Sequence, residues 1–317
     1  SIGRELKAGD EIVVTTLDHD ANVAPWRALE ERGVVVRQAD IRVEDCTLDM
    51  DDLRAKINAR TRVVAVGYAS NAVGTINPVA DIVRLAHAAG ALAFIDAVHY
   101  APHGAIDVRA LDCDFLACSP YKFFGPHTGV MYGKREHLLK LRAYKVRPQY
   151  DRLPDKWEVG TLAHESIAGV LATVEYLAEL GRQSEPNANP AVAGRREALL
   201  AAYRAIGEYE RALAAQMLDG FAKIRGLKVY GISDAARLAE RVPTFGVRLA
   251  GKSPLKCAEF LGARGIFTWD GNYFAINVTE RLGVEESGGL LRIGAVHYNM
   301  PAEIERMLGA LGELARK

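Results

Sequence analysis

Short apolar runs alternate with amphipathic stretches through the first half of the chain. Such runs predict buried strands, and apolar residues spaced three or four apart predict the helices between them. Strands are expected at 11–16, 34–36, 62–66, 91–95, 114–119 and 129–133, and helices at 25–32, 49–57 and 79–89. Strands that alternate with helices at this spacing favour an α/β fold built on a mostly parallel, doubly wound sheet.

The second half of the chain predicts a different arrangement. A polar stretch with two prolines over 142–157 predicts a surface loop, and helices are expected at 165–180 and 195–221. Residues 183–190 are rich in Asn, Pro and Ser, which is typical of an irregular connection. Strands at 227–230, 244–249 and 290–294 and a closing helix at 302–314 predict a smaller α+β domain. We therefore expect a large domain over residues 1–180 and a small C-terminal domain over residues 181–317.

The composition is that of an ordinary globular protein, because 49% of the 317 residues are hydrophobic and 25% are charged. The formal net charge is zero, so neither a nucleic-acid nor a membrane partner is expected. No apolar run reaches membrane-spanning length and no signal peptide is visible. The four cysteines show no CxxC spacing, which is typical of reduced thiols and favours a cytoplasmic location.

A single lysine follows the strand expected at 114–119. Lys122 comes after a Ser-Pro break and is flanked by Tyr121, Phe123 and Phe124. Desolvation among aromatic rings lowers the pKa of a lysine, which favours Schiff-base chemistry of its amine. The alternative is a surface lysine that extends past neighbouring rings.

A carboxylate, Asp96, ends the strand that precedes this one. A lysine for the Schiff base and an aspartate for a pyridinium nitrogen are the two groups that pyridoxal 5′-phosphate requires. Both side chains follow strands at the edge where open α/β sheets bind ligands. A helix N-cap is the alternative role for Asp96. The pair is more specific than either residue alone.

Polar side chains in other loops are further candidates. His19 is suited to stacking on a cofactor ring, and the alternative is a solvated loop histidine. Asn71 and His99 are suited to binding a phenolic oxygen, although a turn and a helix surface are their respective alternatives. Ser119 suits a phosphate or a loop cap. Thr161, at an expected helix start, suits an anion or an N-cap.

Arg292 lies inside the apolar strand expected at 290–294. A buried guanidinium needs an anionic partner, which is either a substrate carboxylate bound through two hydrogen bonds or an internal carboxylate. No cluster has metal-ligand spacing, so no metal is expected. The sequence also lacks a dinucleotide-binding, nucleoside-triphosphate-binding or hydrolase-elbow motif.

Together these residues resemble the class V aminotransferase family of fold-type I pyridoxal-phosphate enzymes, and most closely its cysteine desulfurase-like branch. The resemblance is carried by segments 18–22, 70–75, 96–99, 119–122 and 160–161 and by Arg292, in this order and spacing. It implies a pyridoxal 5′-phosphate cofactor and a homodimer. It also implies the fold-type I transferase fold, with a mostly parallel central sheet and a smaller C-terminal α+β domain.

The resemblance also implies how the cofactor would be held. Lys122 would form the Schiff base, Asp96 would pair with the pyridine nitrogen, and His19 would stack on the ring. Asn71 and His99 would bind the phenolic oxygen.

For the phosphate and the substrate, the resemblance implies three further roles. Ser119 would bind the phosphate, and Thr161 would bind it from the neighbouring subunit of the homodimer. Arg292 would bind the α-carboxylate of an amino-acid substrate.

Several features depart from the Suf-type desulfurases within this family. Those enzymes have a histidine where Tyr121 stands and glutamine where His99 stands. The stretch over 267–275 corresponds to the loop of their nucleophilic cysteine and contains no cysteine. The chain starts at Ser1 with the end of a helix, so we expect the phosphate-binding loop of the family to precede it.

We therefore expect a pyridoxal-phosphate enzyme that acts on an amino acid and lacks the usual desulfurase cysteine. Transamination, β-elimination by a cysteine or selenocysteine lyase, and racemisation all remain open, because the cofactor supports each of them. A catalytically silent binding module on the same fold is the alternative.

Overall fold

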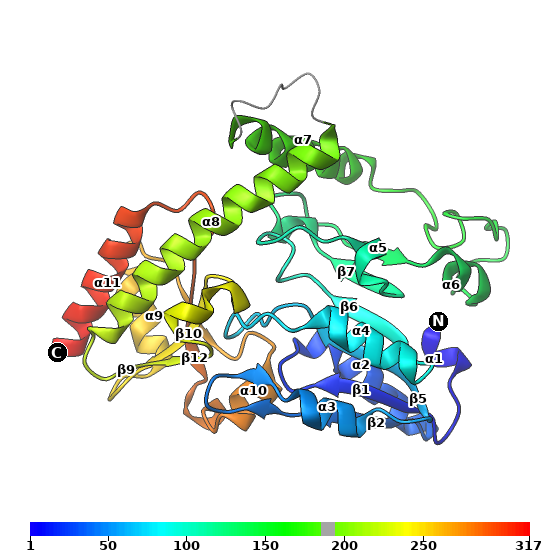
Figure 1. Ribbon diagram of the computed structural model, residues 1–317, viewed down its shortest axis with the longest axis horizontal. Helices are drawn as coiled ribbons and strands as arrows, with labels where there is room; N and C mark the ends of the chain where they lie inside the picture. The colour runs from blue at the N-terminus through cyan, green and yellow to red at the C-terminus, as the bar shows by residue number, and fades with distance from the viewer. Residues whose placement is uncertain (185–193) are drawn as a thin grey trace.

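The computed structural model describes residues 1–184 and 194–317, and two β-sheets organise it (Figure 1). The strands of the larger sheet are β1 (Glu11–Thr15), β2 (Val35–Ala39), β5 (Thr61–Gly67), β6 (Leu92–Asp96), β7 (Phe115–Cys118) and β8 (Val130–Gly133). Their order is β2-β1-β5-β6-β7-β8, and every neighbouring pair is parallel except β7 with β8. The predicted mostly parallel sheet is therefore confirmed.

Strand β1 divides the core into two layers, because successive side chains of a strand point to opposite faces. Val13 joins the cluster that contains side chains of α3 (Met50–Lys56), α4 (Val79–Ala88) and α5 (Val108–Leu111). Ile12 and Val14 join the opposite cluster, against which Trp26 and Leu29 pack. Helical segments therefore pack on both faces of the sheet, and a short β3 (Ile41–Arg42)–β4 (Thr47–Leu48) ribbon lies beside it.

The helix expected over 25–32 is wrong in its second half. After α1 (Ile2–Glu5) and β1, α2 (Ala24–Arg27) tightens into the 3₁₀ helix η2 (Ala28–Arg32). Gly33 follows with a φ of +81°, a left-handed conformation that terminates helices. Because 3₁₀ geometry is common in the last turn of a helix, the pattern of apolar positions did not distinguish it from a longer α-helix.

The second half of the chain forms the smaller sheet and its helical cover. The helices are α6 (Arg135–Lys140), α7 (His164–Ser184), α8 (Arg195–Ala222), α9 (Pro254–Gly262), α10 (Ile276–Arg281) and α11 (Pro301–Arg316). The strands are β9 (Leu227–Tyr230), β10 (Thr244–Leu249), β11 (Trp269–Gly271) and β12 (Leu290–Gly294), in the antiparallel order β11-β12-β10-β9. Short 3₁₀ turns are η1 (Asp20–Asn22), η3 (Pro120–Lys122), η4 (Ala235–Glu240) and η5 (Glu285–Ser287).

Helix α8 reaches from α7 to the smaller sheet (Figure 1). Its side chains Leu213, Met217 and Phe221 belong to the core that α9 and α11 share with that sheet. Helix α7 is longer than the predicted 165–180, so the first two residues of the irregular stretch expected at 183–190 are helical. The rest of that stretch lies outside the described residues. The division into domains over 1–180 and 181–317 stays a prediction.

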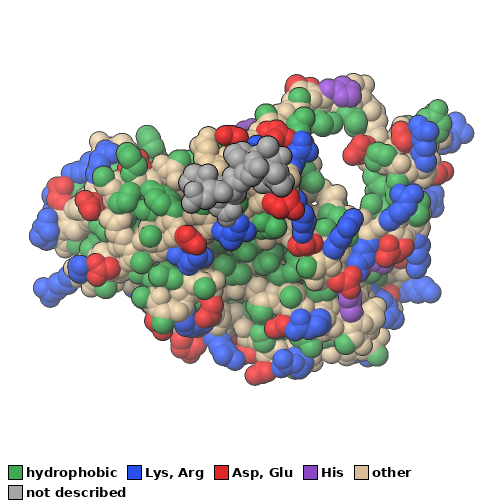
Figure 2. All heavy atoms as spheres, turned by 45° about the horizontal axis from the view of Figure 1, so that its top comes forward, with side chains coloured by type: hydrophobic (Ala, Val, Ile, Leu, Met, Phe, Trp, Pro, Cys, Tyr) green, Lys and Arg blue, Asp and Glu red, His purple; other side chains and the backbone are tan. Residues whose placement is uncertain are grey.

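The surface carries mixed charge. Lys, Arg, Asp and Glu side chains are interspersed over the face shown in Figure 2, which agrees with the formal net charge of zero. Within residues 1–184 and 194–317, none of the helices combines the length and the apolar character that crossing a bilayer requires.

A buried carboxylate at the start of β1 binds an arginine of the edge strand β2. Glu11 is 1% exposed and accepts hydrogen bonds from Arg37, from Arg60 Nε at 2.8 Å and from Asn58 Nδ2 at 2.8 Å. The hydrogen bond from Arg37 is the main cause that lowers the pKa of Glu11 from 4.5 to about 2. Ionised Glu11 therefore stabilises the fold above about pH 4.5, and this contribution is lost as the pH falls through about 2.

The Glu11→Gln variant is expected to lose about 2 kcal/mol of unfolding free energy at pH 7, because it loses the charge that pairs with Arg37 and Arg60. The loss is no larger because both arginines remain partly solvated. Urea denaturation at a series of pH values measures this. The difference from wild type should shrink as the pH falls below 4.5. A difference that is constant with pH would show that the charge of Glu11 is not responsible.

Candidate active site

A cleft of about 790 Å³ opens where the larger and smaller sheets meet. Its walls are the loops after β1, β5, β6 and β7 together with residues of β11 and β12. The strand order reverses between β1 and β5, and open α/β sheets bind ligands at such a position. Seven of the eight predicted residues line the cleft: His19, Asn71, Asp96, His99, Ser119, Lys122 and Arg292.

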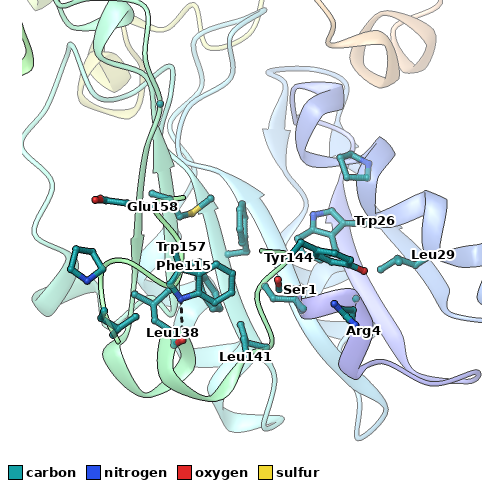
Figure 3. A pocket seen from close by; sticks show the side chains of 18 of the residues that line it. Ser1, Arg4, Trp26, Leu29, Phe115, Leu138, Leu141, Tyr144, Trp157 and Glu158 are labelled. Carbon is teal, nitrogen blue, oxygen red and sulfur yellow. Dashed lines mark hydrogen bonds between the residues drawn. The ribbon is translucent and has the colours of Figure 1, made fainter. Parts of the chain in front are cut away.

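A second cavity of about 820 Å³ lies near the N-terminus and is mostly apolar (Figure 3). Trp26, Phe115 and Tyr144 contribute to its walls, and Trp157 Nε1 donates a hydrogen bond to the Leu138 carbonyl at 3.0 Å. None of the eight predicted residues lines this cavity. The candidate chemistry is therefore confined to the cleft between the sheets.

Asp96 is the last residue of β6 and lies deep in the cleft. Its Oδ1 accepts a hydrogen bond from the Val98 N–H at 2.9 Å, so it caps a turn rather than a helix. Burial raises the pKa of Asp96, while His19 and Lys122 oppose that shift. No hydrogen bond to Oδ2 is found in the described part of the chain. A half-buried carboxylate oxygen of this kind is suited to a cationic N–H partner.

Lys122 ends the 3₁₀ turn η3 and also lines the cleft. The prediction that it is desolvated among aromatic rings is wrong, because Lys122 is exposed and its Nζ lies 5.8 Å from the Tyr121 ring centroid. Phe124 has a φ of +74° and packs instead against His297, with ring centroids 4.6 Å apart. Among the described residues Lys122 forms no ion pair, so its amine is available in the cleft.

His19 follows β1 and its side chain caps η1. Its Nδ1 accepts a hydrogen bond from the Ala21 N–H at 3.0 Å, which places the proton of the neutral ring on Nε2. Burial lowers the pKa of His19, and therefore favours the neutral form. The Phe274 ring lies 5.4 Å away at 33°. A neutral, half-buried ring at the cleft wall is suited to stacking on a planar ligand.

The turn after β5 is stabilised by Ser70 rather than by Asn71. Ser70 Oγ accepts hydrogen bonds from the N–H groups of Ala72 and Val73, both at 3.3 Å. Asn71 Nδ2 instead donates to the Tyr273 carbonyl at 2.8 Å, and its buried Oδ1 has no partner within residues 1–184 and 194–317. Among the described residues, this is the one hydrogen bond that Asn71 Nδ2 donates, although the group carries two N–H bonds. The turn role considered for Asn71 is therefore not needed.

Ser119 and Thr161 are placed differently. Ser119 precedes η3, but its side chain makes no capping hydrogen bond and lines the cleft. Thr161 is exposed and does not line the cleft of its own chain. The helix start expected at Thr161 is wrong, because α7 begins at His164 and Gly160 before it has a φ of +76°.

Arg292, on β12, reaches into the cleft without a carboxylate partner in the described part of the chain. Its Nη1 donates to the Asn71 carbonyl at 3.0 Å, and its guanidinium lies 4.5 Å from the Tyr273 ring centroid. Burial lowers the pKa of Arg292. The internal ion pair considered for this residue is therefore not found, and an anionic ligand would complete its interactions.

Two aromatic residues, Tyr273 and Phe274, contact the predicted residues Asn71 and His19. The sequence did not predict these contacts. Tyr273 and Phe274 have φ values of +56° and +60°, and the Phe274 carbonyl accepts a hydrogen bond from the Asp20 N–H at 2.6 Å. Consecutive non-glycine residues in the left-handed region are strained and occur mainly at functional sites. The sequence carries no signal for this conformation, because neither residue type favours it.

None of the four cysteines lines the cleft. Cys46, Cys113 and Cys257 are buried and Cys118 is half-buried. Burial raises the pKa of Cys46 and of Cys113 to about 11, so both remain thiols near neutral pH. A thiol in such surroundings is a poor nucleophile.

The unsatisfied groups in the cleft fit pyridoxal 5′-phosphate. Among the described residues they are a lysine amine without an ion pair, a carboxylate oxygen of half-buried Asp96 that accepts no hydrogen bond, and a buried amide oxygen without a partner. Lysine and aspartate are the groups that anchor this cofactor and tune its pyridine ring. The unpaired guanidinium of Arg292 remains for a substrate carboxylate.

The sequence matches the family model described as aminotransferase class-V over residues 1–307. It is 31% identical to a cysteine desulfurase of Dickeya dadantii, over all of this chain and 73% of that protein. It is 29% identical to the aminotransferase-like protein FGM3 of Gibberella zeae, over 97% of this chain and 73% of that protein.

Solved structures agree with this assignment. The structure of cysteine desulfurase from Thermococcus onnurineus superposes with a TM-score of 0.83 at 25% identity, and covers 99% of this chain and 75% of that one. The Escherichia coli cysteine desulfurase CsdA gives a TM-score of 0.82 at 26% identity, over 99% of this chain and 74% of that one. The fold is that of the fold-type I pyridoxal-phosphate enzymes. The chain therefore belongs to the class V aminotransferase family, and its cofactor is pyridoxal 5′-phosphate.

Proposed function

We propose that this chain is an enzyme that acts on the α-amino group of an amino acid, with Lys122 as the group that moves the Cα proton. The observation that carries the proposal is the meeting of three groups from distant segments in one cleft. Within the described residues, they are the Lys122 amine, which has no ion pair, the half-buried carboxylate of Asp96 and the Arg292 guanidinium, which has no carboxylate partner.

The residues of the cleft would hold the cofactor from several sides. Asp96 would keep a proton on the pyridine nitrogen, and His19 would cover one face of the ring. Asn71 and His99 would contact the phenolic oxygen, and Ser119 the phosphate. When bound, the cofactor supplies an electron sink for the carbanion formed at Cα.

The chain's own residues would then carry out binding and proton transfer. Arg292 would bind the substrate α-carboxylate and orient the Cα–H bond. Lys122 Nζ would accept the Cα proton as a general base and return a proton as a general acid. This sequence of roles is common to transamination, β-elimination and racemisation, so the site residues do not select one of them.

We propose that the reaction does not use a cysteine nucleophile of the chain. A persulfide-forming desulfurase needs a thiolate that reaches the substrate sulfur, and the cleft contains no cysteine. The region where a substrate side chain would lie contains Trp269 and Phe274, which are 65% and 71% exposed. These rings favour a substrate with a larger or less polar side chain than cysteine.

Incubation with a panel of amino acids tests the proposal. Keto acid, sulfide, altered stereochemistry and pyridoxamine phosphate are scored separately. Pyridoxamine phosphate would identify transamination, sulfide from cysteine would identify a lyase, and a change of configuration alone would identify a racemase. A protein that remains colourless with added cofactor and converts no amino acid would favour the silent binding module.

The proposal includes a homodimer in which Thr161 reaches the cofactor phosphate of the neighbouring subunit. Thr161 is exposed, and the adjoining helix α7 exposes Ile167 and Leu171 by 54% each. Apolar side chains one helical turn apart are suited to an interface. A cytoplasmic location stays a prediction.

The Arg292→Lys variant is expected to raise KM for the amino acid about 10- to 100-fold while kcat falls much less, because lysine keeps the charge but loses the two-pronged contact. Steady-state kinetics on the amino acid identified by the panel measure both constants. Arg225→Lys, which changes an exposed arginine outside the cleft, is the matched control. An unchanged KM for Arg292→Lys would remove Arg292 from the substrate site.

A further inference from the structure

A buried ionisable pair lies behind the cleft and takes no part in the chemistry described above. His103 Nδ1 and Glu210 Oε2 are 2.7 Å apart, and their side chains are 6% and 3% exposed. Neither residue lines the cleft. Glu210 projects from the middle of α8, where a buried carboxylate costs stability unless it has a partner. The pair is therefore a specific feature that requires an explanation.

The pair connects to the cleft through His99. The rings of His99 and His103 lie 5.7 Å apart at 65°, in the same turn after β6. His99 lines the cleft, and its Nε2 shares a hydrogen bond with Thr244 Oγ1 at 3.0 Å. Thr244 is buried at the start of β10. One side of the His99 ring thus faces the cleft, and the other sides contact both halves of the structure.

Helix α8 holds this turn at two points. Tyr203 Oη donates a hydrogen bond to the Ala101 carbonyl at 2.9 Å, and Glu210 binds His103. The two α8 residues are seven positions apart, so they lie on one face of the helix. The position of the turn, and with it the position of His99, is therefore set by α8.

Burial and the basic groups near His99 both lower the pKa of its ring. Burial lowers the pKa of His99 well below its ordinary value, and His103, Arg292 and Lys122 add to this effect. Thr244 is uncharged, and Asp96 is the carboxylate in the same cleft. His103 itself faces Glu210, His99 and His297, and Arg211 and Arg241 line a hollow of about 100 Å³ beside it.

Glu210 also controls the tautomer of its partner. A carboxylate can only accept, so its contact fixes a proton on His103 Nδ1 and leaves Nε2 without that proton in the neutral ring. Glu210 Oε1 is buried without a partner among the described residues. The hollow beside it has room for about three water molecules, which would satisfy this oxygen.

We propose that His103 and Glu210 are positioning residues that hold the His99 ring in one orientation toward the cofactor site. The inference rests on the proposed function, in which His99 contacts the phenolic oxygen of the cofactor. In this arrangement α8, and not only the loop that carries His99, determines the geometry of the cleft.

Ring-nitrogen NMR of histidine-labelled, cofactor-free protein tests the inference without any catalytic step, with the His99 signals assigned from a His99→Gln variant. Wild type should show a single set of His99 ring signals. Glu210→Leu should shift and broaden the His99 signals and raise the dissociation constant for pyridoxal 5′-phosphate about tenfold. Glu210→Gln, which keeps an acceptor oxygen, should restore both readouts in part.

Two further variants complete the experiment. Glu208→Leu changes an exposed glutamate of the same helix and should leave both readouts at the wild-type values. His103→Gln removes the ring from the other end of the pair and should reproduce the Glu210→Leu result, so the test does not depend on one variant folding.

Unchanged His99 signals and unchanged cofactor affinity in folded Glu210→Leu or His103→Gln would overturn the inference. If wild type fails to bind the cofactor, the proposed function fails, while the His99 ring signals still decide whether the pair positions His99.

Discussion

The Lys122→Ala variant is expected to lose the absorbance band at about 420 nm that a lysine-bound pyridoxal cofactor gives, together with at least about 10³-fold of the catalytic rate. The loss is large because one amine is expected to serve two purposes. It would anchor the cofactor covalently, and it would transfer the Cα proton in each reaction that the site supports. No other lysine lines the cleft among the described residues.

Absorbance spectra of purified protein with added pyridoxal 5′-phosphate, and single-turnover kinetics, measure the two losses. Lys140→Ala, which removes an exposed lysine at the end of α6, is the matched control and should behave as wild type. Lys122 is exposed and makes no ion pair in the part of the chain that the structure describes, so its removal should leave the melting temperature nearly unchanged. A band that persists in Lys122→Ala would assign the cofactor to another amine.

The Asp96→Asn variant is expected to lose about 10²- to 10³-fold in rate while keeping the covalently bound cofactor. Asparagine has nearly the same shape but carries no charge, so it cannot hold a proton on the pyridine nitrogen. The ring would then be a weaker electron sink, and the Cα proton would be harder to remove.

The cofactor-free Asp96→Asn variant should be more stable than wild type, although it is less active. Burial raises the pKa of Asp96 above its ordinary value of 3.8, so the folded state favours the protonated carboxyl. As the pH rises from below 3.8 through the folded-state pKa, ionisation destabilises wild type, and this effect is absent in the variant.

Thermal unfolding of the two cofactor-free proteins between pH 4 and pH 8 measures this difference. The advantage of Asp96→Asn should grow with pH. Asp96→Glu, which retains a carboxylate, should keep the pH dependence of wild type. A variant with full activity and lower stability would contradict both parts of the prediction.

Local sequence patterns were sufficient for most of the framework. The strands at 227–230, 244–249 and 290–294 have the predicted bounds, because each apolar or β-branched run begins directly after a glycine or proline, at Gly226, Pro243 and Gly289. The helix expected over 25–32 was wrong only in its second half, which is a 3₁₀ helix, because α-helical and 3₁₀ turns have similar apolar spacing over so few residues.

Part of the candidate site was also visible in the sequence, since residues after parallel strands meet at one sheet edge. The environment of those residues was not visible in the sequence. Phe124 packs on His297, 173 positions away, and the His99–Thr244 contact joins residues 145 positions apart. Such contacts follow from how the two sheets pack, for which no local pattern exists.

We expect the cofactor to bind covalently to Lys122. Borohydride reduction of the protein mixed with pyridoxal 5′-phosphate makes that bond permanent, and peptide mass spectrometry locates it. A phosphopyridoxyl group is expected on Lys122 and on no other lysine. A label elsewhere, or no label at all under conditions where the protein is folded, would contradict it.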